Sequence, residues 1–145
     1  MALFENIYMN GFFGGLVGAI VMSFAMILGG YFNFVHFSFT HTLGKHLLGK
    51  KAKDKYTRPA GATVHMLIGA LFGVIYVILA GAWGFGYNIV SGIIFSLLPW
   101  LIMMLAFFPA LGAGMFGRKF DRRLRDTMLV IHILYGIVLG LFVSL

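Results

Sequence analysis

The chain has 145 residues, of which 61% are hydrophobic and only 10% are charged, and its 11 lysines and arginines outnumber its 4 acidic residues. Soluble globular domains carry about a quarter of charged residues, so this composition excludes an ordinary soluble domain and is typical of a membrane protein. The absence of cysteine excludes disulfides, thiolate metal sites and cysteine nucleophiles.

Four apolar segments, each of about 20 residues, are long enough to cross a bilayer as helices. They run roughly over residues 11–34, 59–81, 89–108 and 127–145. The sequence therefore predicts an all-α fold in which residues 1–145 form a single integral membrane domain, a polytopic four-helix bundle.

The first span, residues 11–34, is rich in glycine. Gly11 and Gly15 stand four residues apart, as do Gly14 and Gly18. Such G-x-x-x-G pairs let helix backbones approach closely in lipid. We therefore predict that Gly14 and Gly18 are helix-packing residues.

Residues 37–58 form the connection to the second span. The first half of this connection, up to Leu48, mixes aromatic residues and leucines with histidines, and predicts a helix at the membrane interface. His36, His41 and His46 are five residues apart, so they do not share a helix face and predict no metal site.

The second and fourth spans carry the same pattern, H-x-x-x-G-x-x-x-G. Its residues are His65, Gly69 and Gly73 in the second span, and His132, Gly136 and Gly140 in the fourth. Four-residue spacing puts each imidazole and its two glycines on one stripe of a helix. The glycines are predicted to pack against neighbouring helices, and the two histidines are candidate cofactor-binding residues.

The third span, residues 89–108, contains one proline and is followed by another. Pro99 is predicted to kink the helix, and Pro109 to end it. The glycine-rich segment 110–126 then leads to the fourth span.

All eleven lysines and arginines lie in the two connections 37–58 and 110–126. The cations predicted to set topology or contact lipid head groups are Lys50, Lys51, Arg58, Arg118, Arg122 and Arg123. The positive-inside rule then predicts a multi-pass protein of the cell inner membrane, with both basic loops cytoplasmic and both termini outside. Cations confined to two loops do not form a nucleic-acid-binding face, so no nucleic-acid partner is expected.

The two halves of the chain also share a loop pattern ahead of each histidine motif. It reads Leu43-Gly44-x-x-x-x-Gly49-Lys50-Lys51 in the first half and Leu111-Gly112-x-x-x-x-Gly117-Arg118-Lys119 in the second. The first and third spans do not align. The pattern predicts two repeated helical hairpins, related by an axis along the membrane normal.

Further features extend through most of the chain. They are Val21-Met22 in the first span, Trp100-Leu101-x-Met103 in the third, the run Pro109-x-x-Gly112-x-Gly114-x-Phe116-Gly117, and Tyr135-Gly136 after the second histidine. Together with the histidine motifs, they resemble an uncharacterised family of small four-span prokaryotic membrane proteins with no assigned function. The resemblance implies the four-span architecture and no activity. Members often carry an acidic residue just after the first span, where this chain has Asn33 and His36, which puts in doubt any site that needs a carboxylate there.

His65 and His132 are the strongest chemical signal, because an ionisable side chain inside a membrane is costly and marks a functional site. Each lies seven residues past the last arginine of a basic loop, Arg58 or Arg125, so both are expected at one depth, about 10 Å below the basic edge. Facing each other, they would suit bis-histidine haem b, a shared metal, a proton relay or contact with a quinone. The alternative is that each histidine hydrogen-bonds a neighbouring helix while the glycines allow close packing.

No catalytic set is readable, since the acidic residues Glu5, Asp54, Asp121 and Asp126 all lie outside the apolar spans. We therefore expect no enzymatic activity of its own. The favoured hypothesis is an accessory or assembly subunit whose partners are the lipid bilayer and other membrane protein subunits, such as those of a respiratory or redox complex. The alternatives are a haem b- or metal-binding redox protein using His65 and His132, and a small oligomeric channel or transporter.

Overall fold

The computed structural model describes residues 6–32, 37–120 and 123–145. Its elements are α1 (Ile7–Tyr31), α2 (Phe39–Leu48), α3 (Asp54–Trp83), α4 (Ile89–Ile102), the π-helical turn η1 (Met103–Phe107), α5 (Phe108–Ala110), the 3₁₀ turn η2 (Met115–Gly117) and α6 (Leu124–Ser144). Over these residues the fold is all-α, which confirms the predicted class. Four helical stretches are long and apolar enough to cross a membrane: α1, α3, the run Ile89–Ala110, and α6.

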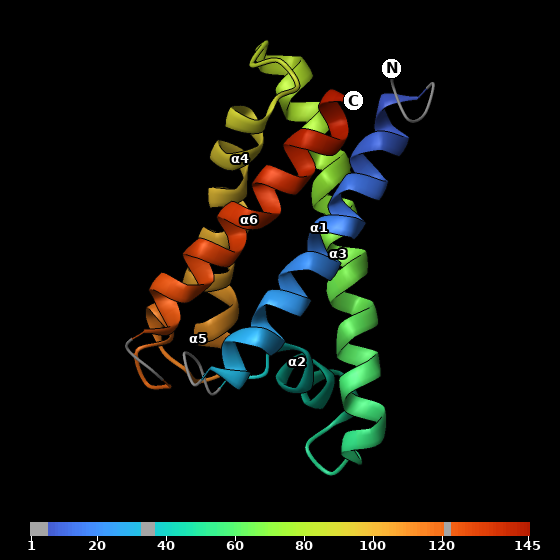
Figure 1. The fold of residues 1–145 in the computed structure, drawn as a ribbon. Coiled ribbons are helices and arrows are strands. Elements are labelled where there is room, and N and C mark those ends of the chain that lie inside the picture. Colours follow the sequence, from blue (N-terminus) through green and yellow to red (C-terminus); the bar gives the residue numbers. More distant parts are fainter. Residues whose placement is uncertain (1–5, 33–36, 121–122) are drawn as a thin grey trace.

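The long helices form two antiparallel pairs, α1 with α3 and α4 with α6, and the pairs meet where α1 contacts α6. Figure 1 shows the start of α1, the end of α6 and the α3–α4 turn at one end of the bundle, and α2 at the other end. From their shared turn, α3 and α4 diverge toward the end that holds α2 (Figure 1). The two pairs therefore splay apart at that end.

Glycines bring α1 and α3 into backbone contact. A Cβ placed on Gly15 would lie 3.0 Å from the Cα of Gly73, and one on Gly11 would lie 2.7 Å from the Gly73 carbonyl oxygen. A Cβ on Gly69 would lie 2.5 Å from the Cβ of Ala19. These positions cannot take a larger residue unless the helices separate.

The α4–α6 pair uses the same arrangement. A Cβ on Gly92 of α4 would lie 2.9 Å from the Cα of Gly140, and one on Gly136 would lie 2.8 Å from the Cα of Ile93. Gly92 thus meets Gly136 and Gly140 as Gly15 meets Gly69 and Gly73. Since α1 and α4 run in one direction and α3 and α6 in the other, the two helix pairs match the predicted repeat.

The repeat extends only in part to the loop residues that align in sequence. Gly44 lies in helix α2, packed against the backbone of Thr57, whereas Gly112 lies in a turn with a φ of 76°. Gly49 and Gly117, which also align, both have a positive φ, of 91° and 65°. The structural repeat therefore resides mainly in the helix pairs.

The second glycine pair of α1 faces a different neighbour. A Cβ on Gly14 would lie 3.0 Å from the Cβ of Phe142, and one on Gly18 would lie 2.7 Å from Cδ2 of Tyr135, both in α6. Two adjacent stripes of α1 therefore pack against α3 and α6, and α6 in turn packs against α1 and α4.

Helix α3 begins earlier than the predicted second span. Its first residue is Asp54, so Pro59 lies inside the helix instead of at its start. The extra residues are stabilised by α2, which crosses α3 where Gly44 meets Thr57 and Gly61 meets Thr40. The segment 54–58 is thus helical where a loop was expected.

Pro99 lies within α4, and the helical path continues past it. A π-helical turn follows at Met103–Phe107, with the N–H of Phe108 bonded to the carbonyl of Met103. Pro109 does not end the path either, since α5 reaches Ala110. The irregularity predicted for this span therefore takes the form of a π-turn, a feature frequent at functional sites.

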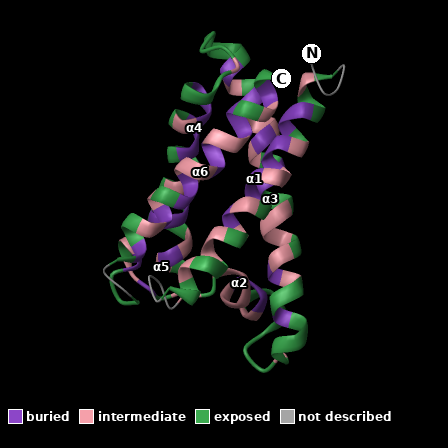
Figure 2. Ribbon diagram, viewed as in Figure 1, coloured by how far each residue is buried: buried purple, intermediate pink, exposed green. Residues whose placement is uncertain are grey.

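Burial follows the pairing of the helices. Figure 2 shows buried residues on the inner faces of the long helices and exposed residues on the outer faces and turns. The outer faces are apolar: Phe24, Ile94 and Val130 are 61%, 62% and 65% exposed. Such faces suit contact with lipid, as the composition predicted.

Candidate functional site

His65 and His132 line one cavity between the two helix pairs, which we call the histidine cavity. Its volume is about 160 Å³. The complete lining is Ala19, Met22, Phe39, His65, Ile68, Gly69, Phe72, Pro99, Ile102, Met103, Phe107, His132 and Tyr135. The structure thus brings together the two histidines that the repeat placed at one depth, in walls that are otherwise almost wholly apolar.

His132 is buried, with 6% of its surface exposed. Its Nδ1 lies 2.7 Å from the carbonyl oxygen of Met128, one turn earlier in α6. Because a carbonyl only accepts, Nδ1 must carry the proton and donate it. In the neutral ring, Nε2 is then left with a lone pair.

His65 is held by two contacts from other helices. Its Nδ1 lies 3.1 Å from Oγ of Ser23 on α1. The ring of Phe39 on α2 packs edge-on against the imidazole, with centroids 5.0 Å apart. A hydroxyl donates or accepts, so the Ser23 contact permits either tautomer of His65.

Tyr135 joins the two helix pairs beside the histidines. Its hydroxyl donates a hydrogen bond of 2.7 Å to the carbonyl oxygen of Gly69 on α3. The tyrosine ring passes over Gly18, which has no side chain to block it. A hydrogen bond in the cavity wall therefore connects α6 to α3.

Aromatic side chains lie on both sides of the histidine cavity along the bundle axis. Toward the α3–α4 turn, Phe72 and Tyr76 pack against Phe95, with ring centroids 6.3 and 5.4 Å from it. Toward α2, the rings of Phe39 and Phe107 lie 5.2 Å apart. Of these rings, Phe72, Phe39 and Phe107 line the cavity itself.

The side of the cavity between α3 and α4 is open toward the surrounding medium. Ile68 on α3 and Ile102 on α4 both line it and are 38% and 45% exposed. The two helices are held together near their turn, where the hydroxyl of Tyr76 lies 2.7 Å from Oγ of Ser91. Since both helices are candidate membrane spans, this opening faces the lipid region.

A second, larger hollow of about 620 Å³ lies between α1, α2 and the start of α3, and we call it the basic-end cleft. Its lining includes Ser23, Arg58 and Ser38. His65 and Phe39 line both hollows, so this pair forms the wall between them.

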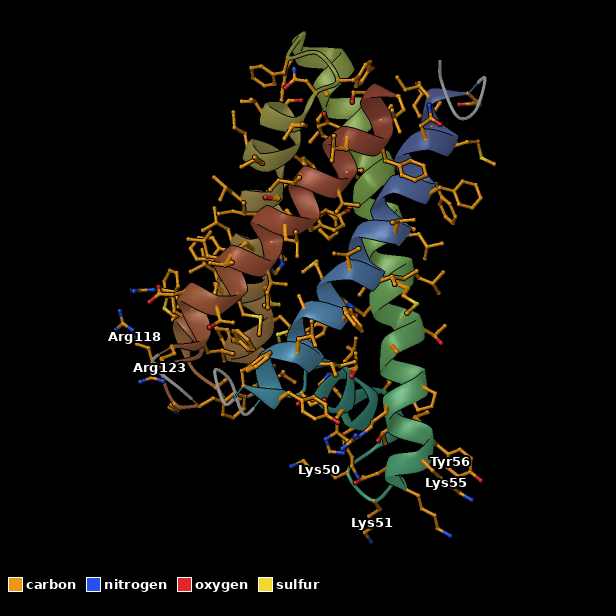
Figure 3. All side chains as sticks on the ribbon, viewed as in Figure 1. Lys50, Lys51, Lys55, Tyr56, Arg118 and Arg123 are labelled. Atoms are coloured by element: carbon orange, nitrogen blue, oxygen red, sulfur yellow. The ribbon has the colours of Figure 1, made fainter. Side chains whose placement is uncertain are left out.

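The basic residues of both connections lie at one end of the molecule. Figure 3 shows Lys50, Lys51, Lys55, Arg118 and Arg123 at the end that holds α2. Arg58 is exposed in the first turns of α3. Arg122 lies outside the described residues.

The loop histidines do not gather into a metal site. Nε2 of His41 and Nζ of Lys45 lie 3.1 and 3.0 Å from Oδ1 of Asp54, at the surface between α2 and α3. His46 is exposed, and His36 lies outside the described residues. Over residues 6–32, 37–120 and 123–145, three or more metal-binding side chains nowhere come together.

Sequence reasoning missed Ser23, Phe39 and the role of Tyr135. In the sequence Tyr135 stands out only as part of a motif, although a tyrosine one turn after a histidine on a glycine stripe is a usable signal. Ser23 is a polar residue in an apolar span, which also marks an interior face. No signal placed Phe39, because its position depends on how α2 packs.

Comparison with known proteins places most of the chain in one family. Residues 6–145 match the model of a family described as a family of unknown function, DUF6789. No curated protein and no solved structure matches the chain. The match confirms the resemblance to an uncharacterised family.

Proposed function

The chain belongs to DUF6789, a family of unknown function, and on this premise we propose that it is a small accessory or assembly subunit of a larger membrane complex, such as a respiratory or redox complex. Its own contribution is to hold a small lipid-soluble molecule in the histidine cavity. The four apolar helices indicate a small multi-pass membrane protein.

One observation carries the proposal: His65 and His132, from different helix pairs, line a single cavity with exposed Ile68 and Ile102 at its side. Mostly apolar walls with a few converging polar groups are typical of ligand sites. A molecule dissolved in the bilayer can enter between α3 and α4 without passing through water.

The accessory role follows from what surrounds the ligand. The described lining of the histidine cavity includes no carboxylate or lysine. The Ser23 hydroxyl contacts His65 from the basic-end cleft, whose described lining also includes no carboxylate to complete a Ser–His–Asp set. We propose that the chain has no catalytic activity of its own and presents its ligand to other subunits. The outer apolar faces of the helices provide the area for those contacts.

The cavity volume disfavours bis-histidine haem. A cavity of about 150 Å³ holds one benzene molecule, and the histidine cavity measures about 160 Å³. Pockets for drug-sized ligands occupy about 300–1,000 Å³. A haem would therefore require α3 and α4 to move apart, whereas a single ring requires no movement.

Orientation is part of the proposal. The described cations of both connections gather at the α2 end, opposite the α3–α4 turn (Figure 3). We place this end on the cytoplasmic face of the inner membrane, as the positive-inside rule favours.

Native mass spectrometry of the protein, released from its own membranes in mild detergent, tests both parts at once. The expected result is a complex heavier than the 16.0 kDa chain, containing a partner subunit and a small lipid-soluble molecule that His132→Leu releases. A bare monomer would refute the proposal. A chain that carries the molecule but no partner would refute the accessory role and keep the ligand site.

A further inference from the structure

The free nitrogen of His132 restricts which molecules fit the histidine cavity, and this inference rests on the ligand-binding part of the proposed function. Nδ1 of His132 donates to the Met128 carbonyl at 2.7 Å. In the part of the chain that the structure describes, Nε2 has no hydrogen-bond partner, and the residue lines the cavity. The neutral ring therefore presents an acceptor to the apolar cavity, where an acceptor is best satisfied by a ligand that donates a hydrogen bond.

The second imidazole of the cavity, that of His65, can donate or accept a hydrogen bond. Nδ1 of His65 shares a 3.1 Å contact with the Ser23 hydroxyl, which donates or accepts. Nε2 of His65 can consequently take either role toward a ligand. A ligand that donates to His132 can thus be matched at His65 whether its second polar atom is a donor or an acceptor.

The walls fix the shape of the head group. A volume of about 160 Å³ is close to the roughly 150 Å³ that holds one benzene ring. Phe72 toward the α3–α4 turn, and Phe39 and Phe107 toward α2, contribute aromatic rings to its wall. One six-membered ring fills this space.

The charge of the cavity lining and its opening to lipid further restrict the ligand. The described cavity lining contains no arginine or lysine that would neutralise an anionic head group, so a carboxylate or phosphate is disfavoured. The side between Ile68 and Ile102 opens to the lipid region, where an apolar tail can extend.

We infer that the histidine cavity binds a single hydroxylated aromatic ring with an apolar tail, a phenol or quinol, whose hydroxyl donates to Nε2 of His132. The tail leaves between α3 and α4. A fully oxidised quinone, which has acceptors only, lacks the donor that His132 requires and binds more weakly than its quinol.

Three small probes separate the ring from its hydroxyl: fluorobenzene, para-fluorophenol and para-fluoroanisole. Binding is measured by fluorine NMR on the purified full-length protein in detergent, against detergent alone to correct for partitioning. All three probes are expected to bind, and para-fluorophenol about tenfold more tightly than para-fluoroanisole, because only the phenol donates a hydrogen bond.

His132→Leu is expected to abolish the preference for the phenol while fluorobenzene still binds. His46→Leu is the matched control, since it removes an exposed histidine outside the cavity, and it should leave the preference unchanged. The comparison of probes on the wild-type chain remains decisive if the variant does not fold.

The two possible failures are distinguishable. Equal affinities for the phenol and the anisole in the wild-type protein would overturn the hydroxyl assignment while keeping the cavity as a ligand site. Absence of binding by all three probes would overturn the cavity proposal as well.

Discussion

The hydroxyl of Tyr135 on α6 donates a 2.7 Å hydrogen bond to the carbonyl oxygen of Gly69 on α3. The bond connects the two helix pairs through the space left by Gly18 on α1, because a Cβ there would lie 2.7 Å from the tyrosine ring. Three helices therefore meet at one side chain, beside the histidine cavity.

Tyr135→Phe removes the hydrogen bond and keeps the ring. We expect a loss of about 1 kcal/mol in the free energy of unfolding, the usual net value of one buried hydrogen bond. The measurement is unfolding in mixed micelles followed by circular dichroism. Tyr87→Phe is the matched control, because its hydroxyl makes only a 3.4 Å contact with the Val77 carbonyl. Equal losses in both variants would show that the Tyr135 bond does not join the pairs.

Gly15→Ala and Gly92→Ala test the repeated packing of the helix pairs. The new methyl group would lie 3.0 Å from the Gly73 Cα in one variant and 2.9 Å from the Gly140 Cα in the other. Since the obstacle is backbone in both, we expect each substitution to cost about 1–3 kcal/mol, as overpacking does.

Gly29→Ala provides the control for this pair. A Cβ at Gly29 has no neighbour within 4 Å, and alanine favours a helix by about 1 kcal/mol over glycine. Its stability should stay unchanged or rise in the same micelle assay. A loss at Gly15 without a comparable loss at Gly92 would contradict the equivalence of the two pairs.

The sequence shows which glycine stripes can pack against another helix, but not which helix each stripe contacts. Four-residue spacing predicts that Gly14, Gly18, Gly69 and Gly136 are packing residues. Spacing along one helix cannot say which neighbour a stripe receives, because that depends on the order of helices around the bundle. That α1 turns Gly14 and Gly18 toward α6, and Gly15 toward α3, is visible only in the structure.

The candidate site shows the same division. The common depth of His65 and His132 follows from matched distances to the basic loops, so their proximity was predictable. The wall made by Phe39 was not, because α2 reaches the cavity only through its crossing with α3 at Gly44 and Gly61. The cavity volume was equally hidden, since it depends on how far α3 and α4 diverge.

Trp100 is an exception to the satisfaction of buried polar groups. Its Nε1 is buried and has no hydrogen-bond partner within the described residues. By the register of the helix pairs it corresponds to Ser23 on α1, whose hydroxyl contacts His65. An unpaired buried donor costs about 1–3 kcal/mol. Trp100→Phe removes this cost, which should offset most of the packing energy lost with the smaller ring.

We therefore expect Trp100→Phe to change the free energy of unfolding by less than about 1 kcal/mol. The same micelle assay measures it, with Trp83→Phe as the control because Trp83 is 64% exposed. A loss above about 2 kcal/mol for Trp100→Phe alone would mean that the indole N–H has a partner, such as a bound water.

The orientation of the chain in the membrane can be read from single cysteines, because the natural sequence has none. Lys51→Cys lies at the basic end, and Phe85→Cys lies in the α3–α4 turn at the other end, where Phe85 is 62% exposed. A maleimide that does not cross membranes is expected to label Phe85→Cys in intact cells, and Lys51→Cys only in inside-out vesicles, because basic loops remain on the cytoplasmic side.

Ile94→Cys, on the outer face of α4 with 62% exposure at the native residue, should resist labelling from both sides, since the reactive thiolate does not form in hydrocarbon. The reverse pattern for the first two variants would place the basic end outside and overturn the proposed orientation, while efficient labelling of Ile94→Cys would mean that α4 faces water and not lipid.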